Sequence, residues 1–306
     1  MTREENVCMG MASHQPTGLF GVIRTFLETI KFSHTVFALP FAFTGAVLAA
    51  SGLPSLYQIF WILMAMVGAR TAAMGLNRLI DAEIDRANPR TCGRAIPAGL
   101  LGKKTVALCS GAAAILFLLA AYRLNYLCFI LSPLALFFLV LYSYCKRFTA
   151  LSHVVLGLCL AVAPVGAWIA IQGSLELTPV ILGIAVLFWV AGFDILYSLQ
   201  DFEFDCATGL YSIPARLGVR GALLTARLFH VATLGVLVSL FVIAGLGYLY
   251  LTGVFIAALL LAYEHWLLKD GDLTKLNAAF FTMNGYISIT VFFFTLGDVL
   301  FSQGFW

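Results

Sequence analysis

The sequence predicts an all-α protein that crosses a membrane many times, with about nine transmembrane helices. Hydrophobic residues make up 61% of the 306 residues and charged residues only 11%, whereas a soluble domain carries roughly 25% charged residues. The shortage of charge extends along the whole chain, so one membrane anchor on a soluble domain does not explain it. The net charge of +3 is small, and no basic run or aromatic–basic stripe indicates nucleic-acid binding.

Apolar runs between polar or Gly/Pro breaks define the expected helices. A helix that spans the hydrocarbon core needs about 20 mostly apolar residues. We predict spans at 20–50, 57–79, 104–122, 125–144, 151–172, 179–200, 220–244, 247–268 and 275–300. The division at 245–247 is the least marked, because two spans meet there with almost no loop. Pro40, Pro133 and Pro164 fall within spans and are expected to kink them.

The loop cations are distributed unevenly between the two sides. One side holds Arg86, Arg90, Arg94, Lys103, Lys104, Lys146, Arg147, Arg216, Lys269 and Lys275. The opposite loops together hold only Arg123. Because positive charge marks the cytoplasmic side, we expect the N-terminus inside and the C-terminus outside. Residues 1–19 lack the apolar stretch of a secretory signal and are interpreted as a cytoplasmic tail. Residues 20–306 are predicted to form one transmembrane domain in a prokaryotic inner membrane.

The second span ends in a first acidic motif. Asn77, Asp81 and Asp85 are spaced four residues apart, which places them on one face of a helix. Arg70 precedes Asn77 by seven residues and lies on nearly the same face. Carboxylates at a membrane surface are costly and are usually functional.

The sixth span ends in a second acidic motif. Asp194, Asp201 and Asp205 fall at i, i+7 and i+11, again on one helix face. The two motifs lie at the same side of the membrane and could converge in one cavity. Each motif also leads through a loop to an Ile-Pro-Ala sequence, and Asp81 and Asp201 are separated by four spans. This similarity suggests an internal repeat of four helices.

Clustered carboxylates require a cation. Oxygen ligands without His or Cys select magnesium, which commonly bridges carboxylates to substrate phosphates. Forked guanidinium donors suit phosphate oxygens, and four arginines lie near the motifs: Arg78, Arg90, Arg94 and Arg216. The combination indicates a diphosphate site. The alternative is that the acids cap helices at the membrane interface and form salt bridges with one another. Two motifs with the same geometry on the same side of the membrane favour the diphosphate site over this alternative.

The motifs resemble those of the UbiA superfamily of intramembrane prenyltransferases. The segment from Asn77 to Asp85 is similar to the first aspartate-rich motif of that family, although Arg78 replaces the usual Asp. The pair Asp201 and Asp205 is similar to the second motif. The Tyr-x-x-x-Lys element of the family occurs at Tyr142 and Lys146. The resemblance extends from about residue 20 to the end of the chain.

The resemblance implies a nine-helix bundle around a central cavity open to lipid. The expected magnesium–diphosphate ligands are Asn77, Asp81, Asp85, Asp201 and Asp205. The residues expected to bind the diphosphate are Arg78, Arg94, Tyr142, Lys146 and Arg216. Arg70 and Asp194 are expected beside an aromatic acceptor, and Asp194, Asp81 and Asp201 are the candidate catalytic residues.

The amino-acid sequences of the two acidic motifs resemble most the 4-hydroxybenzoate polyprenyltransferase branch of the family. They are also similar to prenyltransferases that use a hydroxynaphthoate in menaquinone synthesis by the futalosine route. The substrates would be a polyprenyl diphosphate and an aromatic acid, with Mg²⁺ as the cofactor. Loss of diphosphate from the allylic chain would be followed by attack of the ring. Either Asp194 or a diphosphate oxygen could then remove the ring proton.

A secondary transporter is the main alternative from another class, because it too shows repeats and intramembrane acids. Transporters, however, tend to place coupling acids near the bilayer midplane, whereas these acids lie mostly at one face. No obligate protein partner is implied. The remaining polar candidates are His34 and His153, and neither has a second His at ligand spacing. We expect both to have capping or packing roles.

Overall fold

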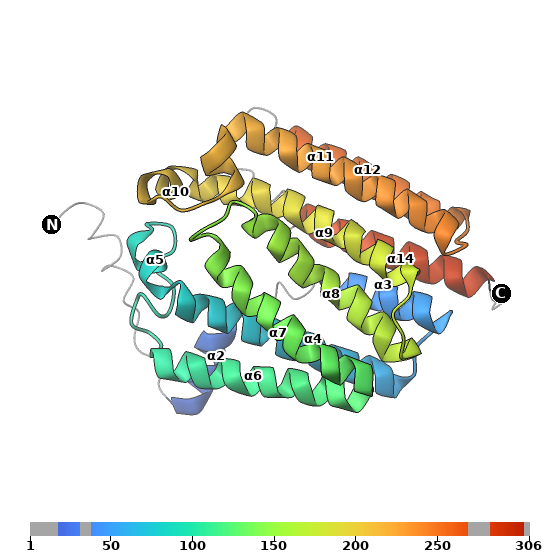
Figure 1. Ribbon diagram of the computed structural model, residues 1–306, viewed down its shortest axis with the longest axis horizontal. Helices are drawn as coiled ribbons and strands as arrows, with labels where there is room; N and C mark the ends of the chain where they lie inside the picture. Colours follow the sequence, from blue (N-terminus) through green and yellow to red (C-terminus); the bar gives the residue numbers. More distant parts are fainter. Residues whose placement is uncertain (1–17, 31–37, 269–281, 303–306) are drawn as a thin grey trace.

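The computed structural model describes residues 18–30, 38–268 and 282–302, and within these ranges all regular secondary structure is helical (Figure 1). The elements are α2 (Gly18–Thr29), α3 (Ala38–Ala50), α4 (Leu56–Ile80), α5 (Ala82–Ala87), α6 (Lys103–Leu124), α7 (Tyr126–Cys145), α8 (Ser152–Gln172), α9 (Leu177–Ser198), the 3₁₀ helix η2 (Leu199–Asp201), α10 (Phe202–Thr208), α11 (Ile213–Ile243), α12 (Tyr248–Leu267) and α14 (Asn284–Ser302). The predicted all-α class is confirmed.

Eight helices in the described ranges are long and apolar enough to cross a membrane, so the protein is an integral membrane protein. Seven of the predicted spans, from 57–79 to 247–268, each coincide with one helix. The first prediction was wrong in detail, because 20–50 contains two helices, α2 and the short apolar α3. The last helix, α14, agrees with 284–300 of the predicted span. The total of nine spans stays a prediction, as do the expectations for 1–17 and His34, which lie outside the described residues.

The long helices run side by side along the longest axis of the molecule (Figure 1). Helix α4 packs mainly on α6, α8 packs on α9, and α9 packs on α11. Helix α3 fills the space between α8 and α14, while α12 packs on α14. A continuous buried core forms around Trp189 of α9, whose ring centroid lies 4.9 Å from that of Phe41 in α3.

Glycines permit the closest of these helix contacts. A Cβ atom on Gly45 of α3 would lie only 2.4 Å from the carbonyl oxygen of Pro164 in α8. A Cβ atom on Gly157 of α8 would lie equally close to the carbonyl oxygen of Leu187 in α9. Lipid tails are as apolar as the side chains, so helices in a membrane associate through such close packing. These contacts therefore fix α3, α8 and α9 relative to one another.

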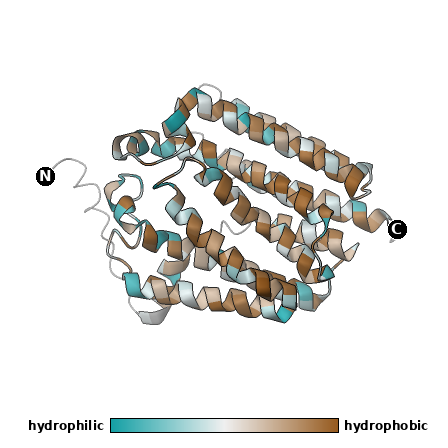
Figure 2. Cartoon of the chain, viewed as in Figure 1, coloured by the Kyte–Doolittle hydropathy of each residue, from teal (hydrophilic) through white to brown (hydrophobic). Residues whose placement is uncertain are grey.

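Two glycines lie near the two ends of the span predicted at 220–244, which corresponds to α11. Gly218 has a φ of 68° and interrupts the helical conformation inside α11, close to the predicted start of a span at 220. Gly245 has a φ of 61° and allows the tight turn from α11 to α12. The short helices α5 and α10 lie at the same end of the molecule (Figure 1). Hydrophilic residues gather at that end, whereas the long helices are mainly hydrophobic (Figure 2).

Candidate functional site

Both acidic motifs lie where a spanning helix gives way to a short helix. Helix α4 ends at Ile80, and Asp81 takes φ −91° and ψ 3° before α5 begins. Asp201 takes nearly the same conformation, φ −102° and ψ 5°, at the end of η2 and directly before α10. The prediction of one continuous helix face for each motif was therefore wrong. The matching breaks agree with the suggested internal repeat, which stays a prediction.

Asp81 is surrounded by basic and amide groups at the end of α4. Asp81 is only 3% exposed. The Nζ atom of Lys146 lies 2.7 Å from Oδ2, and Nη2 of Arg147 lies 3.1 Å from Oδ1. Asn77 donates a hydrogen bond of 3.0 Å from Nδ2 to Oδ2. Since Lys146 and Arg147 follow α7, these contacts join the ends of α4 and α7.

Asp85 is the second carboxylate of the first motif and is also 3% exposed. Its Oδ1 atom accepts a hydrogen bond of 2.6 Å from Nη1 of Arg94. Its Oδ2 atom is buried and has no hydrogen-bond partner. Thr91 donates to the backbone carbonyl of Asp85 at 3.1 Å, which holds the loop after α5 against this residue. Burying an unpaired carboxylate oxygen is costly, so Oδ2 is suited to a positively charged ligand.

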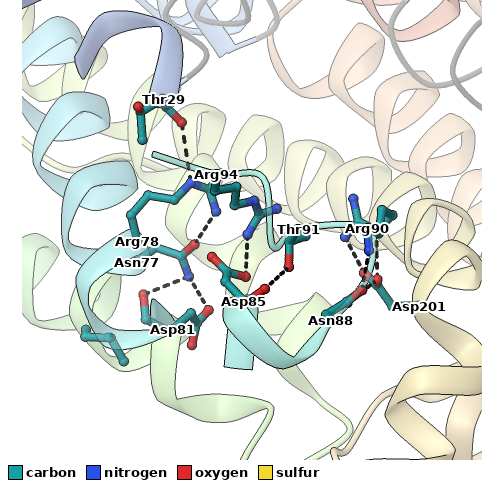
Figure 3. A network of polar contacts seen from close by, with 12 residues as sticks. Thr29, Asn77, Arg78, Asp81, Asp85, Asn88, Arg90, Thr91, Arg94 and Asp201 are labelled. Carbon is teal, nitrogen blue, oxygen red and sulfur yellow. Dashed lines mark hydrogen bonds and ion pairs between the residues drawn. The ribbon is translucent and has the colours of Figure 1, made fainter. Parts of the chain in front are cut away.

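Asp201 connects the two motifs. Arg90 donates to it twice, from Nε to Oδ1 at 2.8 Å and from Nη2 to Oδ2 at 2.5 Å. Asn88 donates a further bond of 2.8 Å to Oδ1. Figure 3 shows Asn88 and Arg90, from the loop that follows α5, converging on Asp201. Partial burial would lower the pKa of Arg90, but the bonds and charge of Asp201 raise it above its ordinary value. The guanidinium therefore remains charged.

Asp205 and Arg216 are less closely tied to this cluster. Asp205 is half-buried on α10 and lies within electrostatic range of Lys146 and Asp201. Arg216 is exposed near the start of α11. In the part of the chain that the structure describes, no side-chain hydrogen bond or ion pair joins Arg216 to either motif, so its predicted diphosphate role remains a prediction.

Arg78 stands where the family motif usually has an Asp. It is 6% exposed. It donates from Nε to the carbonyl of Thr29 at 3.4 Å and from Nη1 to Oδ1 of Asn77 at 3.2 Å. Figure 3 shows its side chain extended toward Thr29 of α2. In the structure Arg78 therefore links α4 to α2 and orients Asn77, while its diphosphate role stays a prediction.

An apolar cavity of about 350 Å³ lies between α4, α6, α7 and α8. Its lining is mostly Ala, Leu, Val, Ile, Met and Phe, and Arg70 is the one charged residue among the described residues that line it. The Nε atom of Arg70 is buried and has no hydrogen-bond partner. Asn77 and Tyr142 also line the cavity. Because Asn77 bonds to Asp81, the cavity adjoins the acidic cluster directly.

Asp194 lies on α9, about two turns before Asp201. Its Oδ2 atom is 2.7 Å from Nδ1 of His153 at the start of α8. Tyr142 lies within electrostatic range of both Asp194 and Asp81. The predicted capping or packing role of His153 is confirmed, because the ring is buried and accepts a hydrogen bond from the N–H of Ile213 at the start of α11. The sequence did not predict the second contact of the ring, which is the bond to the candidate catalytic carboxylate of Asp194.

The residues at the site fit a hard cation. Asp85 Oδ2 is a buried carboxylate oxygen that accepts no hydrogen bond, and Asp81 Oδ1 is a buried oxygen that forms an ion pair with Arg147 but accepts no hydrogen bond of good geometry. Hard cations prefer such oxygen ligands. Among the described residues, no group of three or more His, Cys, Asp or Glu side chains is close enough to hold a metal ion. The ion pairs explain this, since each carboxylate is drawn toward its own Lys or Arg. Magnesium usually takes only one or two protein carboxylates and completes its shell with water and phosphate oxygens.

Sequence reasoning missed several polar residues of the site. Asn88, Thr91 and Arg147 were not singled out as site residues, although all three contact the acidic motifs. Arg147 also donates to the carbonyl of Ile80 at 2.8 Å. Its position directly after Lys146 was a usable signal, because a second cation at the same helix end can reach the same carboxylate.

Comparison with known families decides the class of protein. The model of the UbiA prenyltransferase family matches residues 38–286, which is most of the chain. The chain belongs to the UbiA prenyltransferase family. It is therefore an enzyme that transfers prenyl groups, and the transporter alternative is not supported.

Other UbiA proteins are similar to this chain over most of its length. A 4-hydroxybenzoate octaprenyltransferase from Francisella tularensis subsp. mediasiatica is 30% identical over 251 residues, covering 81% of this chain and 87% of the relative. The apo structure of a UbiA homolog from Aeropyrum pernix K1 has a TM-score of 0.79 and 31% identity, covering 89% of this chain and 98% of that one. A UbiA homolog from Archaeoglobus fulgidus bound to DMAPP and Mg²⁺ has a TM-score of 0.62 and 20% identity, covering 87% and 99%. The fold is thus that of UbiA proteins.

Proposed function

We propose that this UbiA enzyme transfers a polyprenyl chain from an allylic polyprenyl diphosphate to 4-hydroxybenzoate, ortho to the hydroxyl, in quinone biosynthesis. The Francisella relative, named as an octaprenyltransferase for this acid, supports the acceptor. The Archaeoglobus homolog with its bound prenyl diphosphate and Mg²⁺ supports the donor and the metal.

One observation carries the proposal: Asn77 lines the apolar cavity and also bonds to Asp81 in the acidic cluster. A polyprenyl diphosphate has the same two parts, an apolar tail and an anionic head. The tail matches a cavity lined mainly by aliphatic and aromatic side chains. The head matches the cations that already surround the carboxylates. The reacting carbon, which joins tail to head, would then lie beside Asn77.

The cations of the site bind the leaving diphosphate. Lys146, Arg90 and Arg94 each contact a carboxylate, and their charged groups can also pair with the phosphate oxygens of a donor. Mg²⁺ held by Asp81, Asp85, Asp201 and their neighbours Asn77 and Asp205 would supply further positive charge for the leaving oxygens. The residues therefore stabilise charge that develops in the transition state more than charge in the ground state.

The cavity residues bind and orient the acceptor. Arg70 has a buried, unpaired Nε atom in apolar surroundings. A charge-assisted hydrogen bond to a carboxylate is strong in such surroundings. Arg70 therefore binds the carboxylate of the aromatic acid. Asp194 does not line the cavity but lies within electrostatic range of Tyr142, which does. Asp194 then receives the proton that leaves the ring after the new carbon–carbon bond forms. The apolar lining keeps water away from the allylic cation.

Membranes that contain the protein test the proposal. They are incubated with Mg²⁺, an allylic polyprenyl diphosphate, and either 4-hydroxybenzoate or a hydroxynaphthoate. We expect diphosphate release coupled to prenylated 4-hydroxybenzoate, identified by mass spectrometry, and loss of the product in Asp81→Asn and Asp201→Asn. Product only with the hydroxynaphthoate would reassign the acceptor to the menaquinone route. Normal turnover in both variants would overturn the assignment of the acidic site.

We also propose that the protein lies in a prokaryotic inner membrane with this site facing the cytoplasm. The proposal rests on the cations of the loops beside the site. Cys206 tests it, because it is a free, exposed cysteine on α10. A membrane-impermeant maleimide should label Cys206 in inside-out vesicles and leave it unlabelled in intact cells, and a Cys206→Ser variant gives the background. The reverse pattern would invert the orientation.

A further inference from the structure

The ring of His153 joins three segments of the molecule. It lies in the first turn of α8 and is only 3% exposed. Its Nδ1 atom is 2.7 Å from Oδ2 of Asp194 on α9. Its Nε2 atom accepts a hydrogen bond of 3.3 Å from the backbone N–H of Ile213, the first residue of α11. Both ring nitrogens are therefore engaged, one by a side chain and one by the backbone.

The backbone contact determines where the ring carries its proton. The N–H of Ile213 can only donate, so Nε2 must be an acceptor without a proton. A neutral imidazole has one N–H, which then lies on Nδ1 and points at Asp194. A doubly protonated ring would set an N–H of Nε2 against the N–H of Ile213. The arrangement selects a neutral histidine that donates one hydrogen bond to a carboxylate.

We propose that His153 is a positioning residue for Asp194, an inference that rests on the proposed function. The bond fixes Oδ2 and the plane of the carboxylate. Among the described residues, Oδ2 is the Asp194 oxygen with a hydrogen-bond partner. The side chain of Asp194 is 17% exposed. Oδ1 is thus left for the acceptor ring.

The transfer step shows what this positioning achieves. The carbon–oxygen bond of the donor breaks, and its electron pair leaves with the diphosphate. A ring carbon of the acceptor then bonds to the first carbon of the prenyl chain, and the hydrogen on that ring carbon leaves as a proton. Oδ1 of Asp194 takes the proton, while Oδ2 keeps its bond from His153. The imidazole stays neutral throughout, so its contribution is orientation rather than proton transfer.

Two substitutions separate the two contacts of the ring. In His153→Asn, the amide nitrogen lies near the position of Nδ1 and can still donate to Asp194, whereas the bond from Ile213 is lost. In His153→Gln, the amide oxygen reaches the position of Nε2 and can still accept from Ile213, whereas the donor to Asp194 is lost. Purified variants are compared by kcat, by KM for each substrate and by their thermal unfolding midpoint in detergent.

We expect kcat of His153→Gln to fall about 10- to 100-fold, the usual range for loss of a residue that orients a functional group. Its KM for the prenyl diphosphate should stay unchanged, and His153→Asn should keep most of the kcat. The opposite ranking of the two variants, or equal losses that follow their unfolding midpoints, would show that His153 only anchors α11 and would overturn the inference. Wild-type protein that turns over no aromatic acceptor would instead refute the proposed function, so the two failures are distinguishable.

Discussion

Arg90 and Asp201 form a two-point ion pair, with Nε 2.8 Å from Oδ1 and Nη2 2.5 Å from Oδ2. The two residues belong to different halves of the chain, 111 positions apart. The pair therefore joins the loop after α5 to the segment between α9 and α10. The pair thereby holds the two acidic motifs together.

Replacing Arg90 by Lys should weaken use of the prenyl diphosphate. A lysine keeps the charge but cannot form the forked pair. We expect kcat/KM for the donor to fall about tenfold, which corresponds to roughly 1.4 kcal/mol. Arg86→Lys is the matched control, because Arg86 is an exposed arginine of the same segment whose side chain contacts Glu83. Equal effects of the two substitutions would show that the geometry of the Arg90 pair is unimportant.

Replacing Asp85 by Asn should raise the requirement for Mg²⁺. The change removes the charge of the buried oxygen Oδ2, which lacks a hydrogen-bond partner. We expect the Mg²⁺ concentration for half-maximal activity to rise by about tenfold or more. Glu83→Gln, on the same short helix but exposed to solvent, should leave it unchanged. A wild-type Mg²⁺ titration curve for Asp85→Asn would exclude Asp85 as a metal ligand.

Replacing Arg70 by Gln should affect the acceptor and spare the donor. The guanidinium is the charged group in the cavity lining, so its loss should raise KM for 4-hydroxybenzoate about 100-fold, roughly the value of a charge-assisted bond. The methyl ester of the acid gives a sharper measurement. Wild-type enzyme should strongly prefer the acid, whereas Arg70→Gln should use acid and ester about equally. If the variant retains the preference, the carboxylate binds elsewhere.

Replacing Asp298 by Ala should lower stability without changing the chemistry. Asp298 on α14 accepts bonds from the backbone N–H groups of Gly247 and Tyr250, at 2.6 and 3.1 Å, and so caps the start of α12. Loss of a capping side chain costs about 0.5–2 kcal/mol. The unfolding midpoint should fall, and kcat below the unfolding range should stay normal. Thr252→Ala is the control, since the hydroxyl of this exposed threonine bonds only to its own helix.

Hydropathy predicted the spans between 57 and 268 well, because a helix in lipid must be apolar over its full length. The same signal could not divide 20–50 into α2 and α3, since hydropathy does not mark where one helix ends and the next begins. The helix breaks at Asp81 and Asp201 were missed for a related reason. A spacing of four residues is compatible with one helix, and the break is decided by contacts with other segments.

The acids of the site could be predicted because charges stand out in a chain with so few of them. The roles of His153 and Asn88 could not. His153 meets Asp194 across 41 positions, and Asn88 meets Asp201 across 113. Single polar residues of this kind gain a function only through the tertiary fold, and neither has a local pattern that distinguishes it from a capping residue.

The cations beside Asp81, Asp85 and Asp201 also bear on how the protein is made and handled. Unpaired carboxylates at the edge of a membrane would resist burial, and a site that depended on metal to neutralise them would stay open until the metal arrived. Here Lys146, Arg94 and Arg90 already provide the opposite charge. We therefore expect the polypeptide to insert, fold and withstand purification in chelator, and Mg²⁺ added afterwards to bind at these residues.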